Sequence, residues 1–194
     1  MHPWNDWYHC TAHTYGTWLR GDPRGWRARH HREHVDGDYK NPPPRGSYNE
    51  LFKHSKLLMK RDPVKVAREL QHFVLVAMLD RLWELSIRTP IASFDGIHMH
   101  GLLRCPDHNP RIVLGIAKQY ATAKLKAHGS AMGLDLNLKD GEGIWGKRSH
   151  PKPVSDPEHY DNTFSYIDKH AQRGATVIRE DDSALIPDID LLVE

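Results

Sequence analysis

Apolar and polar residues alternate from Trp7 to Tyr15 and from Ile97 to Cys105, and a period of two residues is typical of β-strands with one buried face. The three predicted strands are Trp7 to Tyr15, Ile87 to Phe94 and Ile97 to Cys105. Asp95-Gly96 separates the second strand from the third and favours a two-residue hairpin turn. A shorter segment, Gly143 to Arg148, predicts a fourth strand.

Three longer segments repeat apolar residues with the helical period. They run from Asp62-Pro63 to Leu85, from Asn109-Pro110 to Gly129, and from the Ser155-Asp156-Pro157-Glu158 start to Gly174. Each begins with a capping side chain followed by proline, as helix starts commonly do. The order β-α-β-β-α-β-α predicts an α+β fold, because its first six elements form the split β-α-β, ferredoxin-like arrangement. We expect an antiparallel sheet with two helices on one face, the first and third strands as central neighbours, and an additional C-terminal helix.

The chain length fits one domain, which we place at residues 1–175. Within it, residues 16–48 are rich in Gly, Pro and Arg and predict a long basic insertion or loop, and residues 176–194 predict an acidic tail. No apolar run reaches the length of about 18 residues that a membrane span requires. With only Cys10 and Cys105 present, we expect no disulfide framework and a reducing, cytoplasmic location.

The net charge of +2 is unevenly distributed. Lysine and arginine outnumber acids between Arg20 and Arg68, where Trp26 and Tyr48 lie among them. Basic and aromatic side chains together favour a polyanion with stackable bases, such as nucleic acid. An ordinary solvated surface remains the alternative.

His98 and His100 flank Met99 in the third predicted strand, so both imidazoles should project from one face while Met99 projects from the other. Two neutral imidazoles on one rigid strand form a possible clamp for a divalent metal ion. About one His-x-His pattern is expected by chance in so histidine-rich a chain, so the pair needs a third ligand to be informative. The residues expected on the same face of this strand and of the first strand are His9, Thr11, His13 and Arg104.

The last predicted helix presents two chemically useful side chains away from its apolar stripe. Tyr160, Phe164, Ile167 and Ala171 form that stripe, so Tyr160 is interpreted as a packing residue. Tyr166 lies far from the stripe, and His170 follows it at i+4 on the same side. The alternative is a surface Tyr and His on an amphipathic helix. Lys169 and Arg173 lie beside them.

These residues give the chain a resemblance to the one-tyrosine HUH transposases, the single-strand DNA transposases of small insertion sequences and their REP-associated relatives. The family signature is His-hydrophobic-His on a central strand, read here as His98-Met99-His100, followed by a C-terminal helix with Tyr and a polar metal ligand at i+4. Tyr166 and His170 match that second motif, and Ile144-Trp145-Gly146 looks like the family's Trp-containing stretch. His170 departs from the usual Gln or Asn, which puts the identity of the metal in doubt more than the activity.

The resemblance implies that Tyr166 is the catalytic nucleophile and that His98, His100 and His170 hold a divalent ion, Mg²⁺ or Mn²⁺. It further implies a homodimer that binds single-stranded DNA with hairpin ends and cleaves it through a 5′-phosphotyrosine intermediate. No nucleotide cofactor and no membrane are expected, and the location would be a prokaryotic cytoplasm, near the nucleoid. The candidate DNA contacts are His9, Thr11, His13, Arg104, Lys169 and Arg173.

Three alternatives stay open at this point. A domesticated relative would bind or nick host repeats without transposition, and a metal-dependent hydrolase would use water in place of Tyr166. Separately, His30, His31 and His34 have a spacing that a second metal site could use, although a polar DNA-facing loop explains them better because the segment has no apolar stripe.

Overall fold

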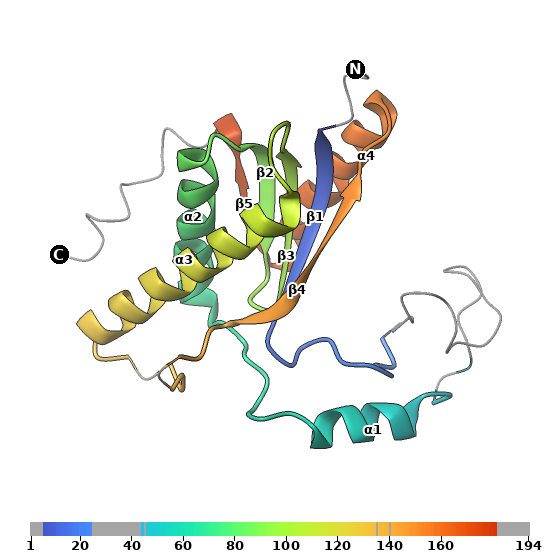
Figure 1. Cartoon of the computed structure of the whole chain (residues 1–194), viewed down its shortest axis with the longest axis vertical. Helices are drawn as coiled ribbons and strands as arrows, with labels where there is room; N and C mark the ends of the chain where they lie inside the picture. The colour runs from blue at the N-terminus through green and yellow to red at the C-terminus, as the bar shows by residue number, and fades with distance from the viewer. Residues whose placement is uncertain (1–5, 25–43, 45, 135, 140, 182–194) are drawn as a thin grey trace.

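A five-stranded antiparallel sheet in the order β4-β1-β3-β2-β5 forms the centre of the chain in the computed structural model (Figure 1). The structure describes residues 6–24, 44, 46–134, 136–139 and 141–181. The strands are β1 (Trp7–Thr14), β2 (Arg88–Phe94), β3 (His98–Arg104), β4 (Trp145–Pro153) and β5 (Thr176–Arg179). The α+β, ferredoxin-like prediction is confirmed, since β1 and β3 are central neighbours with β2 and β4 outside them.

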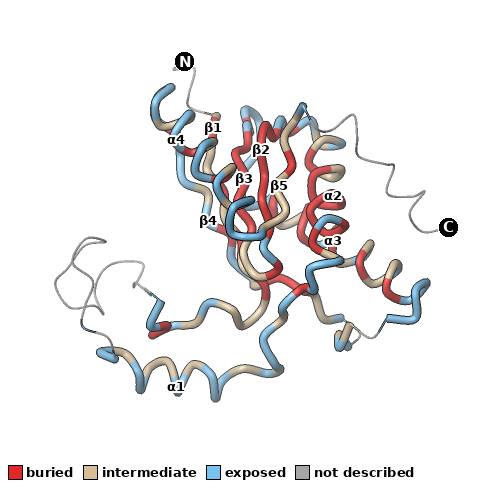
Figure 2. Tube along the Cα trace, turned by 180° about the vertical axis from the view of Figure 1, so that it is seen from behind, coloured by how far each residue is buried: buried red, intermediate tan, exposed pale blue. Residues whose placement is uncertain are grey.

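The helices cover both faces of this sheet. They are α1 (Asn49–Leu57), α2 (Arg68–Glu84), α3 (Pro110–Ala131), α4 (Pro157–Asp168) and the 3₁₀ helix η1 (Lys169–Arg173). Figures 1 and 2 show α2 and α3 against one face and α4 against the other, while α1 lies apart from the strands. None of the helices in the described part of the chain is long and apolar enough to cross a membrane.

Each face of the sheet has its own apolar cluster. Met99, Leu103 and other buried side chains pack under α2 and α3, and the sheet and α2 contain much of the buried chain in Figure 2. On the opposite face, Leu102 packs with Ile91 and with Ile167 of α4. The alternation of β3 therefore holds as predicted: Met99 lies in the larger core, and the even-numbered positions face α4.

The hairpin between β2 and β3 fixes where the histidine strand begins. The Asp95 Oδ1 atom accepts hydrogen bonds from the backbone N–H groups of Ile97, at 2.9 Å, and His98, at 2.6 Å. Gly96 has φ +90°, and a Cβ atom there would lie 2.5 Å from the carbonyl oxygen of Val66. The predicted turn at Asp95-Gly96 is confirmed, but residues 95–97 separate β2 from β3 instead of two residues. Glycine is required at position 96 both by its backbone conformation and by the close approach of another chain segment.

The helix predicted from Asp62-Pro63 begins later, at Arg68. The backbone N–H of Val64 donates to Tyr15 O at 2.8 Å, and that of Val66 donates to Gly96 O at 2.9 Å. These long-range bonds hold the segment in an extended form, so the prediction of a helix start at residue 62 is wrong. The other predicted helix starts are confirmed: Asn109 caps α3, and Asp156 caps α4 by accepting from His159 N.

Three further elements differ from expectation. Residues 49–57 form α1, which was not predicted from the sequence. None of its residues is buried, so the segment has no core-facing apolar stripe that would indicate a helix. β4 extends to Pro153 rather than ending at Arg148, since its position at the sheet edge tolerates Pro151 and Pro153. Lys169–Arg173 forms η1 rather than continuing the α-helix, although Gly174 ends the segment as predicted, with φ +82°.

The start predicted for the acidic tail also needs correction. Thr176–Arg179 forms β5 and pairs with β2, so the sheet continues past residue 175. Glu180 forms an ion pair with Arg88, and Arg179 pairs with Asp168 at the end of α4. Residues 182–194, residues 25–43 of the predicted insertion, and the cluster His30, His31 and His34 lie outside the described residues.

The hairpin generates a stability prediction with a built-in control. Gly96→Ala should lower the free energy of unfolding by more than about 1 kcal/mol, because alanine is strained at positive φ and would meet Val66 O. Gly115→Ala, in the interior of α3 with nothing within 4 Å of the added Cβ, should instead raise it by about 0.5–1 kcal/mol. Urea denaturation measures both, and equal effects of the two substitutions would contradict the role assigned to Gly96.

Candidate functional site

Four predicted site residues from three elements converge on one pocket. His98 and His100 of β3, Tyr166 of α4 and His170 of η1 line a cavity of about 140 Å³ on the α4 side of the sheet. Asp95, Arg173 and Ala175 complete its lining. Residues that are distant in sequence thus meet because α4 packs across the face from which the strand histidines project.

The rings of the two strand histidines are inclined to each other at 62°, with one nitrogen of each close to the other. His100 Nε2 lies 3.1 Å from His98 Nδ1, and the ring centroids are 4.1 Å apart. When two imidazole nitrogens each lie about 2.1 Å from one ion and the nitrogen–ion–nitrogen angle is about 95°, the two nitrogens are separated by about this same distance. The pair therefore fits two neighbouring positions in the coordination sphere of a divalent ion.

His100 is the most enclosed member of the site, with 4% of its surface exposed. Thr11 of β1 and Ser93 of β2 are its register partners on the two neighbouring strands. Its second ring nitrogen, Nδ1, lies 3.0 Å from His9 Nε2. If His100 Nε2 ligates a metal, its Nδ1–H can donate to His9, which is the kind of contact that fixes the tautomer of metal-binding histidines.

Tyr166 reaches this pocket because the rest of α4 is held on the sheet. Ile167 and Thr163 are buried, and Tyr160 packs edge-on against Trp7 with ring centroids 4.9 Å apart, as its packing role predicts. Tyr166 itself is 43% exposed. Its ring centroid lies 5.4 Å from that of His100 and 4.8 Å from that of His170, so the phenol borders both the histidines and solvent.

His170 is positioned by Ser93, a residue for which the sequence predicted no role in the site. The Ser93 hydroxyl lies 2.9 Å from His170 Nδ1, and the His170 ring centroid is 4.5 Å from that of His100. Among the described residues, no group of three or more His, Cys, Asp or Glu side chains is already arranged around a single ion. The strand pair brings two ring nitrogens together, and His170 lies beside it with Nε2 as the nitrogen not bonded to Ser93.

Burial keeps the histidines of this site neutral near pH 7. Removal from water, followed by the charges of neighbouring histidines, lowers the pKa of His100 to about 2. Burial likewise lowers the pKa of His13 to about 4 and that of His9 to about 4, with smaller contributions from nearby cations. The pKa values of His98 and His170 are also lowered, mainly by burial. Neutral imidazoles have free lone pairs, which is the state that a metal ion or a transferable proton requires.

The candidate DNA contacts are distributed unequally around the pocket. His9, Thr11 and His13 lie on the same face as His98 and His100, and Arg173 lines the pocket. Lys169 is exposed on η1 outside the pocket lining. Arg104 is at the other end of β3, about 20 Å along the strand from His98 at 3.4 Å per residue.

Beyond the predicted residues, the structure adds an aromatic group at the His98 side of the pocket. His13 stacks on His98 with ring centroids 4.4 Å apart, and Trp18 stacks on His13 at 5.5 Å. His150 of β4 approaches His13 edge-on at 6.4 Å. The sequence shows these residues as separate aromatic positions, and only the pairing of β1 with β3 and β4 brings them together.

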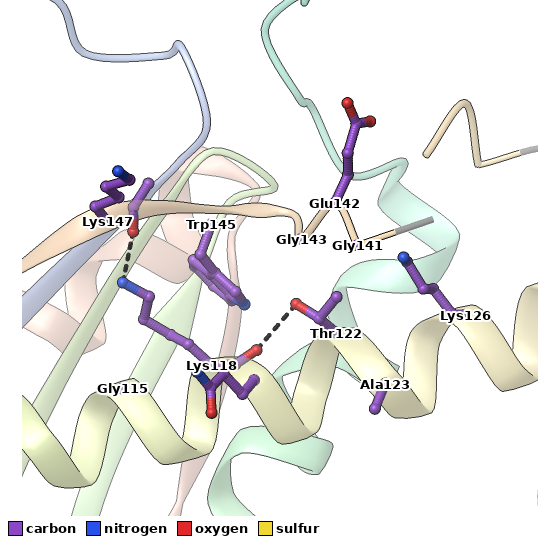
Figure 3. A pocket seen from close by; sticks show the side chains of 12 residues that line it. Gly115, Lys118, Thr122, Ala123, Lys126, Gly141, Glu142, Gly143, Trp145 and Lys147 are labelled. Carbon is purple, nitrogen blue, oxygen red and sulfur yellow. Dashed lines mark hydrogen bonds between the residues drawn. The ribbon is translucent and has the colours of Figure 1, made fainter. Parts of the chain in front are cut away.

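A larger pocket of about 520 Å³ lies on the other side of the sheet, between α3 and the start of β4 (Figure 3). Lys118 in its wall is 6% exposed and donates to Gly146 O at 2.6 Å and to Ser149 Oγ at 3.3 Å. Burial lowers the pKa of this ammonium group to about 8. None of the predicted site residues lines this pocket, and the contacts of Lys118 support β4 where its pairing with β1 shifts register.

Comparisons with protein-family models, with curated proteins and with solved structures found no match for this chain.

The lowered histidine pKa values predict a specific pH dependence of stability in metal-free protein. Between about pH 6.5 and pH 4 the unfolded chain binds protons that folded His9 and His13 do not, so the free energy of unfolding falls as the pH falls. In His13→Phe, which removes one such group and keeps a ring beside His98, this fall should be shallower. Denaturant titrations at a series of pH values in chelator measure it, and an unchanged slope in the variant would contradict the assignment.

Proposed function

We propose that this protein is a one-tyrosine HUH-type endonuclease that cleaves and rejoins single-stranded DNA, as a transposase of that family does. The observation that carries the proposal is the convergence of Tyr166, His98, His100 and His170 on one pocket. The tyrosine and the His98–His100 pair match the residue types that the resemblance assigns to strand cleavage, and His170 stands where the family usually has Gln or Asn. Packing alone does not require a half-exposed phenol beside three histidines.

The reaction follows from the positions of these side chains. A divalent ion, Mg²⁺ or Mn²⁺, held by His98, His100 and His170 would polarise the scissile phosphate and neutralise the charge that develops on it. The Tyr166 phenol oxygen attacks phosphorus and forms the Tyr–O–P bond, while the bond from phosphorus to the 3′ oxygen breaks. The phenolic proton is lost and the departing oxygen gains a proton, which gives a 5′-phosphotyrosine and a free 3′-hydroxyl. Reversal by another 3′-hydroxyl rejoins the strand without a nucleotide cofactor.

Two neighbouring groups support this chemistry. Arg173 lines the pocket and supplies a positive charge for the phosphate backbone. Neutral His9 contacts His100 and lies 5.8 Å from Tyr166 between ring centroids, so it can hold His100 in one orientation.

We further propose a homodimer and a prokaryotic cytoplasmic location. The Tyr166 side chain lies beside the histidines of its own chain, and this favours active sites assembled within each subunit.

Tyr166→Phe tests the nucleophile. Wild-type protein with Mn²⁺ or Mg²⁺ and single-stranded hairpin DNA should form a covalent protein–DNA adduct that survives denaturing electrophoresis, and Tyr166→Phe should form none because the attacking oxygen is missing. Tyr160→Phe is the matched control: the ring still packs on Trp7, so its adduct should persist.

Other outcomes of this experiment separate the alternatives. An adduct that persists in Tyr166→Phe overturns the nucleophile assignment. Cleavage without any adduct in the wild type indicates a hydrolase that uses water, and binding without cleavage indicates a domesticated DNA-binding protein.

Substitution of His170 tests the third ligand. His170→Gln introduces a residue type that the family uses at this position and should keep measurable cleavage with an altered ratio of Mn²⁺- to Mg²⁺-supported rates. His170→Ala should lower the rate by at least about tenfold, within the range seen when groups around a metal are removed. Rates from single-turnover cleavage across metal concentrations measure both, and equal rates in wild type and His170→Ala would exclude His170 as a ligand.

A further inference from the structure

A column of stacked side chains extends from the strand histidines to the protein surface. His98 stacks on His13 with an interplanar angle of 14°, and His13 stacks on Trp18 with an angle of 12°. The guanidinium carbon of Arg24 lies 5.3 Å from the centre of the Trp18 ring. The column thus begins at a candidate metal ligand and ends in a cation and an indole.

The outer end of this column is exposed. Trp18 is 42% exposed, and the Arg24 side chain is 52% exposed. An exposed indole offers a large, rigid ring surface that a ligand can contact, and the guanidinium of Arg24 lies next to it. Trp18 does not line the pocket itself but is connected to the pocket residue His98 through the ring of His13.

The surrounding turn holds this end in place before any ligand binds. The Thr17 hydroxyl donates to Thr14 O at 2.9 Å, and the Thr14 hydroxyl donates to Val64 O at 2.6 Å. Arg24 is fixed by the carboxylate of Asp22, a residue that is 4% exposed, with Nε donating to Oδ1 at 2.9 Å and Nη2 to Oδ2 at 2.6 Å. A ring and a guanidinium that are already ordered lose little conformational freedom on binding.

We infer that Trp18 and Arg24 form a stacking platform for a nucleobase of the single strand that enters the Tyr166 pocket. Every base has a flat π-face that stacks on indole or guanidinium planes, and Arg24 also attracts the adjoining phosphate. The inference rests on the proposed function, because it assigns to the strand cleaved at Tyr166 a second point of contact. Stacking does not distinguish one base strongly from another, so the platform positions the strand and adds affinity without setting its sequence.

The test compares two single strands of equal length, oligothymidylate and the same sugar–phosphate chain without bases. Binding is measured in EDTA with Tyr166→Phe protein, so that cleavage does not interfere. Adding Trp18→Ala should weaken binding of oligothymidylate by about tenfold, within the range for loss of one stacked base, and should leave binding of the abasic chain unchanged. Trp18→Phe should restore most of the loss because it returns a ring.

Ile112→Ala is the matched surface control, since Ile112 is 64% exposed on α3, on the other side of the sheet. It should change neither affinity, and melting temperatures of all variants should agree to show that the turn is intact. Equal affinities of the Trp18→Ala protein and its parent for oligothymidylate would overturn the platform, as would equal weakening toward both strands.

The result also separates the platform from the proposed function. If wild-type protein forms the covalent adduct and Trp18→Ala binds like its parent, only the platform is wrong. If the parent binds neither strand and the wild type forms no adduct, both are wrong.

Discussion

The register of β3 between β1 and β2 is the constraint on which the candidate site depends. It places His98 opposite His13 and His100 opposite both Thr11 and Ser93, all on the face that α4 covers. A slip of one residue would turn the two histidines into the α2 and α3 core and expose Met99 to the pocket. The Asp95-Gly96 turn and the burial of Met99 and Leu103 oppose such a slip, so the turn and the apolar residues on the opposite face of β3 fix the direction of the two histidines.

The second constraint is the docking of α4, which brings Tyr166 to the pair of strand histidines. Ile167 packs with Leu102, the residue two positions beyond His100 on the same face of β3. The same apolar contact that holds the helix therefore sets the distance between Tyr166 and the histidines. The ion pair of Arg179 with Asp168 and the pairing of β5 with β2 hold the chain after η1, so His170 is anchored from both sides.

Local sequence signals predicted the parts of the fold that depend on local chemistry. The Asp95-Gly96 turn, the caps Asn109 and Asp156, and the alternation of β3 are each set by a few adjacent residues, and all three are confirmed. The late start of α2 and the existence of β5 depend on hydrogen bonds to distant segments, which no local pattern contains.

For the site, spacing along one strand or helix predicted the four pocket residues. The contacts of Ser93 with His170 and of His9 with His100 were not predictable, because they require the sheet order first.

Burial and function act on the same imidazoles in opposite ways. Burial, together with the neighbouring histidines, depresses the pKa of His100, so stability falls as the pH drops below the ordinary histidine pKa, because the unfolded chain takes up a proton there and the folded chain does not. An apolar residue at position 100 would avoid this penalty and would continue the Leu102 side of the sheet. A cation at the pocket would reverse the balance, because neutral nitrogens that are unfavourable places for a proton are favourable ligands for a metal. Along the stacked column, burial likewise keeps His13 neutral between His98 and Trp18, so its ring links the surface turn to the strand histidines.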